Sequence, residues 1–94
     1  MSQLPSVELL ESTHSFPCAF VFKVIGKVEG GFVARVVAAV RAELGDDVDP
    51  PYSMRQTTGG RHIAVTLEPH VRTAAQVVAI YQQIQRMDGV VMML

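Results

Sequence analysis

The chain has 94 residues, of which 49% are hydrophobic and 18% charged, a size and composition typical of one globular domain. Eight Lys and Arg against nine Asp and Glu give a formal net charge of -1, so no general attraction to nucleic acid or to an anionic membrane is expected. The sequence has no apolar run long enough to span a membrane, and its single cysteine, Cys18, excludes an intrachain disulfide. We expect a cytoplasmic protein with neither nucleic acid nor a membrane as partner.

The first part of the chain precedes any clear hydrophobic pattern. Residues 1–15 are mostly polar and have no pattern beyond a short apolar cluster at Val7, Leu9 and Leu10, and we expect a flexible segment there, followed by one domain at residues 16–94. The domain begins with strict alternation between two faces, one with Phe16, Cys18, Phe20, Phe22 and Val24, the other with Ala19, Val21, Lys23 and Ile25. Both faces are largely apolar, which predicts a central strand over residues 16–25.

A glycine-rich connection leads from this strand into the first predicted helix. Residues 26–31 contain three glycines, and apolar side chains then recur at helical spacing up to Gly45, a natural helix stop. The apolar stripe consists of Phe32, Val33, Val36, Val37, Val40 and Leu44. We expect Arg35 and Arg41 to point into solvent on the other side of the helix.

The second half of the chain is typical of a hairpin, a helix and a final strand. An extended segment at 52–58 and an alternating segment at 61–68 flank a pair of glycines, which predicts an antiparallel hairpin. Thr73 and Gln76 then form a capping-box pattern in front of a second amphipathic helix. Residues 90–94 complete the chain as a strand.

This order of elements predicts an α+β fold, the ferredoxin-like βαββαβ sandwich, in which a four-stranded antiparallel sheet carries both helices on one face. The helices would cover the face with Phe20, Phe22, Ile63 and Val65. The other face of the sheet would be open, and apolar side chains there would form a patch for a protein partner or for self-association. The last strand would be a sheet edge able to pair with another chain. The last strand would present either Val91 and Met93 or Val90 and Met92 to this face, and Lys23 would be the main interruption of the apolar patch. The candidate interface residues are Ala19, Val21, Lys23, Ile25, Ala64 and Met93.

Three segments resemble a known family. They are residues 16–26 (FPCAFVFKVIG), residues 55–67, and the end of the chain, where Ile80-Tyr81 is followed by DGVVMML at 88–94. Together they resemble the YbeD-like family of small bacterial proteins over about residues 16–94. The resemblance implies a ferredoxin-like fold similar to the ACT-type regulatory domains of amino-acid metabolism, and a family without an established biochemical activity.

A small effector is the alternative to a protein partner. In ACT-type domains a comparable loop binds small effectors, and the N–H groups at the start of a helix can hold a carboxylate. On this interpretation the ligand-binding residues are Gly26, Lys27, Gly30 and Gly31. Glu29 places negative charge in the same loop, and the spacing matches no phosphate-binding loop, so glycines that serve a tight connection are the favoured interpretation.

Catalytic and metal-binding functions have little support in the residues. The stretch through Phe32 and Arg35 also resembles the phosphate loop of acylphosphatases, but the chain contains no Asn to orient water. His62 and His70 would lie about 26 Å apart on an extended strand, too far to share one ion. The polar residues at 57–62 favour a solvated turn. We therefore expect a non-catalytic regulatory or interaction module, not an enzyme, with neither metal nor cofactor.

Overall fold

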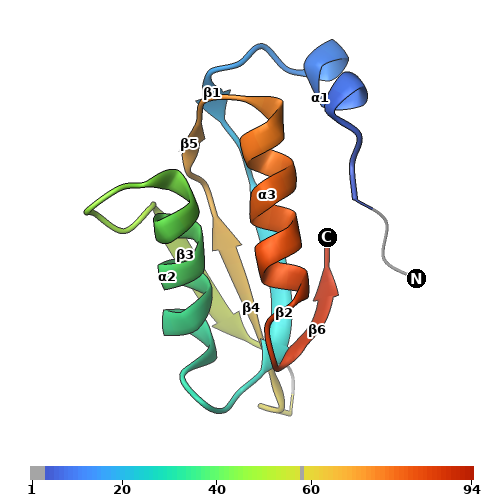
Figure 1. The fold of residues 1–94 in the computed structure, drawn as a ribbon. Coiled ribbons are helices and arrows are strands. Elements are labelled where there is room, and N and C mark those ends of the chain that lie inside the picture. The colour runs from blue at the N-terminus through green and yellow to red at the C-terminus, as the bar shows by residue number, and fades with distance from the viewer. Residues whose placement is uncertain (1–3, 58) are drawn as a thin grey trace.

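The computed structural model describes residues 4–57 and 59–94 (Figure 1). Its helices are α1 (Val7–Thr13), α2 (Phe32–Leu44) and α3 (Ala74–Gln85). Its strands are β1 (Cys18–Ala19), β2 (Phe22–Lys27), β3 (Tyr52–Gln56), β4 (His62–Leu67), β5 (His70–Val71) and β6 (Val90–Met93). Four of the strands form an antiparallel sheet in the order β3-β4-β2-β6, and α2 and α3 lie side by side over one face of it. This is the predicted ferredoxin-like arrangement.

The core lies between the sheet and these two helices. Phe22 and Val24 of β2 and Val65 and Leu67 of β4 point toward the helices and are fully buried. Alternation along a strand sends the intervening side chains to the other face, and Val21, just before β2, is 53% exposed. The helices complete the core with Phe32, Val36, Val37, Val40 and Leu44 from α2 and Ala74, Val77, Ile80 and Ile84 from α3. The predicted covered face of the first strand is therefore confirmed.

The strands β1 and β2 form one nearly continuous ladder with β5 and β4. β1 pairs with β5 in the same register in which β2 pairs with β4. Between the two pairs, the Phe20 N–H donates to the Pro69 carbonyl oxygen at 3.0 Å. Pro69 has no N–H to donate in return, so the ladder is interrupted there without a shift of register. The single strand predicted over residues 16–25 is split in two for this reason.

The helix α1 lies against α3 at the start of the chain. Its N-cap is Ser6, whose side-chain oxygen accepts a hydrogen bond from the Leu9 N–H at 3.1 Å. Leu10 is 5% exposed and belongs to the core. The packed part of the chain therefore begins before residue 16, where the sequence placed the domain boundary, while the flexibility of residues 1–15 stays a prediction.

The edge strand β6 pairs with β2 through an irregular register. The pairing shifts between Ile25 and Gly26 of β2, so that β6 carries one extra residue, Val91. Such a β-bulge breaks the strict alternation of side chains. Val90 and Met93 consequently both lie on the covered face, where they pack against the core. The expectation that Met93 lies on the open face is therefore wrong.

Candidate functional site

The connection between β2 and α2 is a tight loop. Of the four candidate ligand-binding residues, the two that this loop depends on are Gly30 and Gly31. Gly30 and Gly31 have φ values of 64° and 66°, a left-handed conformation that side chains other than glycine rarely adopt. Gly31 is also the N-cap of α2 and supplies no side-chain cap. Lys27 precedes the loop as the exposed last residue of β2. The left-handed backbone conformation of the loop therefore explains both glycines.

Gly26 serves the packing of α2 onto the sheet. It is buried, and a β-carbon built on it would lie 2.2 Å from Cζ of the Phe32 ring. Because Gly26 has no side chain, the ring of Phe32, the first residue of α2, can lie against the backbone of β2. Gly26 is covered by this ring and is not accessible to a ligand, so its candidate role in binding is not supported by its position.

Arg35 connects the same loop to the turn between α3 and β6. Its Nε donates a hydrogen bond to the Gly30 carbonyl oxygen at 2.9 Å, and its Nη1 donates to the Asp88 carbonyl oxygen at 3.0 Å. Its guanidinium carbon lies 5.7 Å from the centre of the Phe32 ring. The expectation that Arg35 points freely into solvent is wrong. Its position three residues after Phe32, on the same side of the helix, is the sequence signal for this contact.

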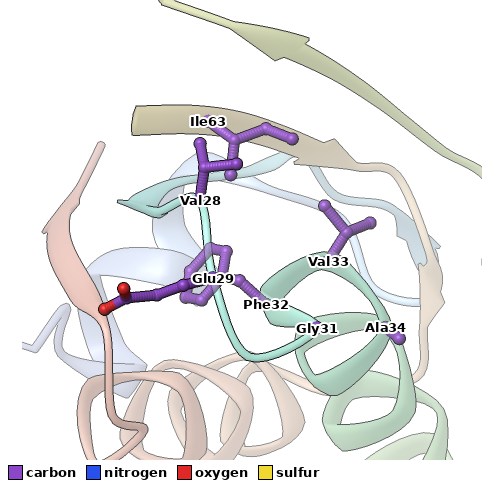
Figure 2. A pocket seen from close by; sticks show the side chains of 7 residues that line it. All are labelled: Val28, Glu29, Gly31, Phe32, Val33, Ala34 and Ile63. Carbon is purple, nitrogen blue, oxygen red and sulfur yellow. The ribbon is translucent and has the colours of Figure 1, made fainter. Parts of the chain in front are cut away.

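A small pocket lies beside the loop (Figure 2). It has a volume of about 260 Å³ and is lined by Val28, Glu29, Gly31, Phe32, Val33, Ala34 and Ile63. Of the four candidate ligand-binding residues, Gly31 alone lines it. The lining is apolar except for Glu29, whose carboxylate points away from Val33 and Ile63 in Figure 2. The residues that line it include the acidic Glu29 and neither Lys nor Arg, and this charge disfavours the carboxylate of an amino-acid effector even though the pocket adjoins the start of α2.

The open face of the sheet is more polar than the sequence suggested. The register places on it Ser53 and Arg55 from β3, Lys23, Ile25 and Lys27 from β2, His62, Ala64 and Thr66 from β4, and Met92 from β6. Ala19 and Val21 extend this face and are exposed. Five of the six candidate interface residues therefore lie on one surface. The expectation that Lys23 is the main interruption of an apolar patch is wrong, since Lys27 and Arg55 also lie there.

Apolar surface gathers instead along the outer edge of β6. The strand pairs with β2 on one side, and no described strand pairs with the other side. Val91, Met92 and Leu94 are 50%, 50% and 61% exposed. A groove of about 760 Å³ runs between this edge, α3 and residues 4–9. The sequence predicted the edge but not the groove, because its far wall belongs to the segment expected to be flexible.

The remaining candidates from the sequence are not brought together into a site. Cys18 is half-buried in β1. Within residues 4–57 and 59–94, no three His, Cys, Asp or Glu side chains are grouped as a metal site requires. Thr57 closes the hairpin, since its N–H and its Oγ1 both donate to the His62 carbonyl oxygen, at 2.9 and 3.2 Å. Thr58 lies outside the described residues. In the described part, no helix has the length and apolarity needed to span a membrane.

Comparison with known sequences shows which family carries this arrangement. A family model described as "Protein of unknown function (DUF493)" matches residues 11–94. The chain belongs to this family. Among similar proteins, a UPF0250 protein of Shewanella sp. (strain ANA-3) is 31% identical over 83 residues, which cover 88% of each chain. A UPF0250 protein of Nitrosomonas europaea is 27% identical over 84 residues, which cover 89% of this chain and 97% of the relative.

These matches confirm the resemblance to the YbeD-like family and add no activity to it. Among solved structures, the solution structure of protein HP0495 from H. pylori has a TM-score of 0.60 and covers 100% of this chain and 98% of its own. Its sequence identity is 15%, so the likeness shows the fold alone. The function of this DUF493 protein has to be argued from its own surfaces.

Proposed function

We propose that this DUF493 protein is a non-catalytic interaction module that binds an extended segment of a partner protein along the outer edge of β6. The observation that carries the proposal is an unpaired, apolar sheet edge that faces a groove. Backbone N–H and C=O groups on such an edge can form a new ladder with an incoming strand, and the groove can take the side chains of that strand.

The composition of β6 supports this role. Exposed edge strands usually carry a lysine, a proline or an inward-pointing charge that prevents pairing with other chains. β6 has the sequence VVMM, without any of these residues, and the following Leu94 is also exposed. β3, the edge at the other side of the sheet, contains Arg55 and three uncharged polar or hydroxyl-bearing residues among its five. Both edge strands expose apolar side chains, since Met54 of β3 is 60% exposed, so the difference between them is the charge of Arg55, which β6 lacks. An uncharged edge is the one expected to receive a partner strand.

The experiment uses a matched pair of surface substitutions. Val91→Lys places a charge on the edge of β6, whereas Val48→Lys places the same charge in the connection before β3, where Val48 is 75% exposed. The wild type and both variants are immobilised and exposed to extract of the source cell, and a retained protein is then purified and titrated. We expect Val91→Lys to weaken its binding tenfold or more, about 1.4 kcal/mol, and Val48→Lys to leave it unchanged. Equal binding by all three forms would show that the outer edge of β6 is not the binding site.

A small-effector sensor is the second candidate, and the pocket beside the β2–α2 loop is the observation that favours it. Its apolar lining suits a small apolar ligand better than an amino acid. A ligand that binds the native state raises the melting temperature by mass action. A panel of amino acids and metabolites that leaves the melting temperature unchanged would argue against the sensor and would not affect the interaction module.

A further inference from the structure

We propose that the open face of the sheet is a second docking surface, which binds an acidic polypeptide segment. This face is a different surface from the outer edge of β6, and it is set apart by its charge. The four strands of the main sheet contain three cationic side chains, Lys23, Lys27 and Arg55, and none of the nine Asp and Glu residues of the chain.

The acidic residues lie in α1, in α2 and in the connections between elements. Glu68 directly follows β4, two residues after Thr66, and bounds the basic surface at that end of the strand. Within the described residues, the ion pair closer than 4.0 Å is Arg41 with Asp49. The three cations of the sheet therefore have no acidic partner in that part of the chain, and their charge is available to another molecule.

The centre of this face is a shallow depression of about 340 Å³. It is lined by Lys23, Ser53, Met54, Arg55, Ala64 and Thr66. The small side chain of Ala64, between Ile25 and Arg55 in the register, leaves the depression open. In the next row of the sheet, Thr66 pairs with both Lys23 and Ser53. A carboxylate placed there would meet an ammonium, a guanidinium and two hydroxyl donors, which is the donor set that anionic oxygens prefer.

An acidic polypeptide fits this surface better than a nucleic acid does. The described face carries no Phe, Tyr or Trp on which a base could stack; its one ring is the imidazole of His62, the first residue of β4, and the net charge of the chain is -1. In an extended peptide, side chains four residues apart are about 13 Å apart on one face. Lys23 and Lys27 on β2 have the same spacing. A strand with Asp or Glu at alternate positions can therefore place carboxylates opposite both lysines.

The test is a fluorescence anisotropy titration with three labelled probes. They are a peptide of six Glu-Thr repeats, its Gln-Thr counterpart, and an oligothymidylate of twelve nucleotides. We expect saturable binding of the Glu-Thr peptide, weakened about tenfold when salt is raised from about 50 to about 300 mM. The Gln-Thr peptide and the oligothymidylate should bind at least about tenfold more weakly. An absence of saturable binding, or tighter binding of the oligothymidylate, would overturn the proposal.

Variants locate the binding site. Lys23→Gln and Arg55→Gln should each weaken binding of the Glu-Thr peptide by about fivefold, because each removes one cation from the depression. The matched control is Arg86→Gln, an equal loss of charge at an exposed position at the end of α3, which should change affinity less than about twofold. Val91→Gln on β6 should also bind normally. If Val91→Gln abolished binding while the two face variants bound normally, the peptide would be occupying the edge and the inference would be wrong. Far-UV circular dichroism verifies that each variant is folded.

Discussion

The ring of Phe32 lies directly over Gly26, close enough that a β-carbon on Gly26 would come within 2.2 Å of Cζ of the ring. Real β-carbons do not approach other heavy atoms so closely, so Gly26→Ala must displace the ring or separate α2 from β2. We predict that Gly26→Ala lowers the free energy of unfolding by about 2 kcal/mol or more, the range found for overpacked cores. Urea denaturation followed by circular dichroism measures the loss.

A double-mutant cycle separates crowding from other effects of the added methyl group. In a Phe32→Leu background the ring is gone, so Gly26→Ala should cost at least about 1 kcal/mol less than in the wild type. Strictly additive effects of the two substitutions would show that the cost arises elsewhere.

The two arginines of α2 should differ in their contribution to stability, although the sequence suggested the same solvated role for both. Arg35 donates to the carbonyl oxygens of Gly30 and Asp88, which belong to two separate connections. We predict that Arg35→Gln costs about 1–2 kcal/mol, because two hydrogen bonds from a charged donor are lost. Arg41→Gln breaks an exposed ion pair with Asp49 and should cost less than about 1 kcal/mol. Chemical denaturation of both variants provides the comparison, and equal losses would contradict it.

The stability of the fold should depend on pH through Tyr81. Burial raises the pKa of the Tyr81 hydroxyl above its ordinary value of 10.0, because the phenolate is poorly solvated there. Between the unfolded and folded pKa values, the folded state holds a proton that the unfolded state has lost. The contribution of this group to stability is therefore complete below the unfolded value of 10.0 and decreases as the pH rises through the folded pKa.

Tyr81→Phe removes this titration and keeps the ring that packs against Phe22, with ring centres 5.2 Å apart. We predict that the wild type loses more stability than Tyr81→Phe when the pH is raised from about 9 to about 11. Other groups titrate in both proteins, so their effects cancel when the two losses of stability are compared. An equal loss in the two proteins would show that the Tyr81 hydroxyl has the same pKa in the folded and unfolded states.

The architecture could be predicted from the sequence because local hydrophobic periods decide which side of each element is buried. Phe22 and Val24 alternate with less buried neighbours, and Val36 and Val40 recur at helical spacing, so the layers follow from the pattern alone. The register at β6 could not be predicted in this way. A one-residue bulge at Val91 reverses the alternation, and no local pattern marks it. This is why Met93 was expected on the wrong face.

The candidate site required information on residues distant in the sequence. Arg35 and Asp88 are 53 positions apart, and their hydrogen bond exists because α2 packs beside α3. The basic face likewise combines Lys23 with Arg55 from opposite sides of β4. Net charge, which the sequence gives directly, averages over the molecule and conceals this separation of acidic connections from a basic sheet. The pattern predicted an open face correctly and described its chemistry incorrectly.

The adjacent residues Val21 and Phe22 test which face of the sheet is covered by the helices and which is open. Phe22 is fully buried and packs against the rings of Phe20 and Tyr81, whereas Val21 is 53% exposed. We predict that Phe22→Ala lowers the free energy of unfolding by about 3–5 kcal/mol through lost burial and a residual cavity. A domain of this size has only about 5–15 kcal/mol of stability, so this variant should melt at a much lower temperature or be unfolded. Val21→Ala should change stability by less than about 0.5 kcal/mol. Thermal and urea unfolding of the two variants measure the difference, and comparable losses would mean that the sheet has no uncovered face at this position.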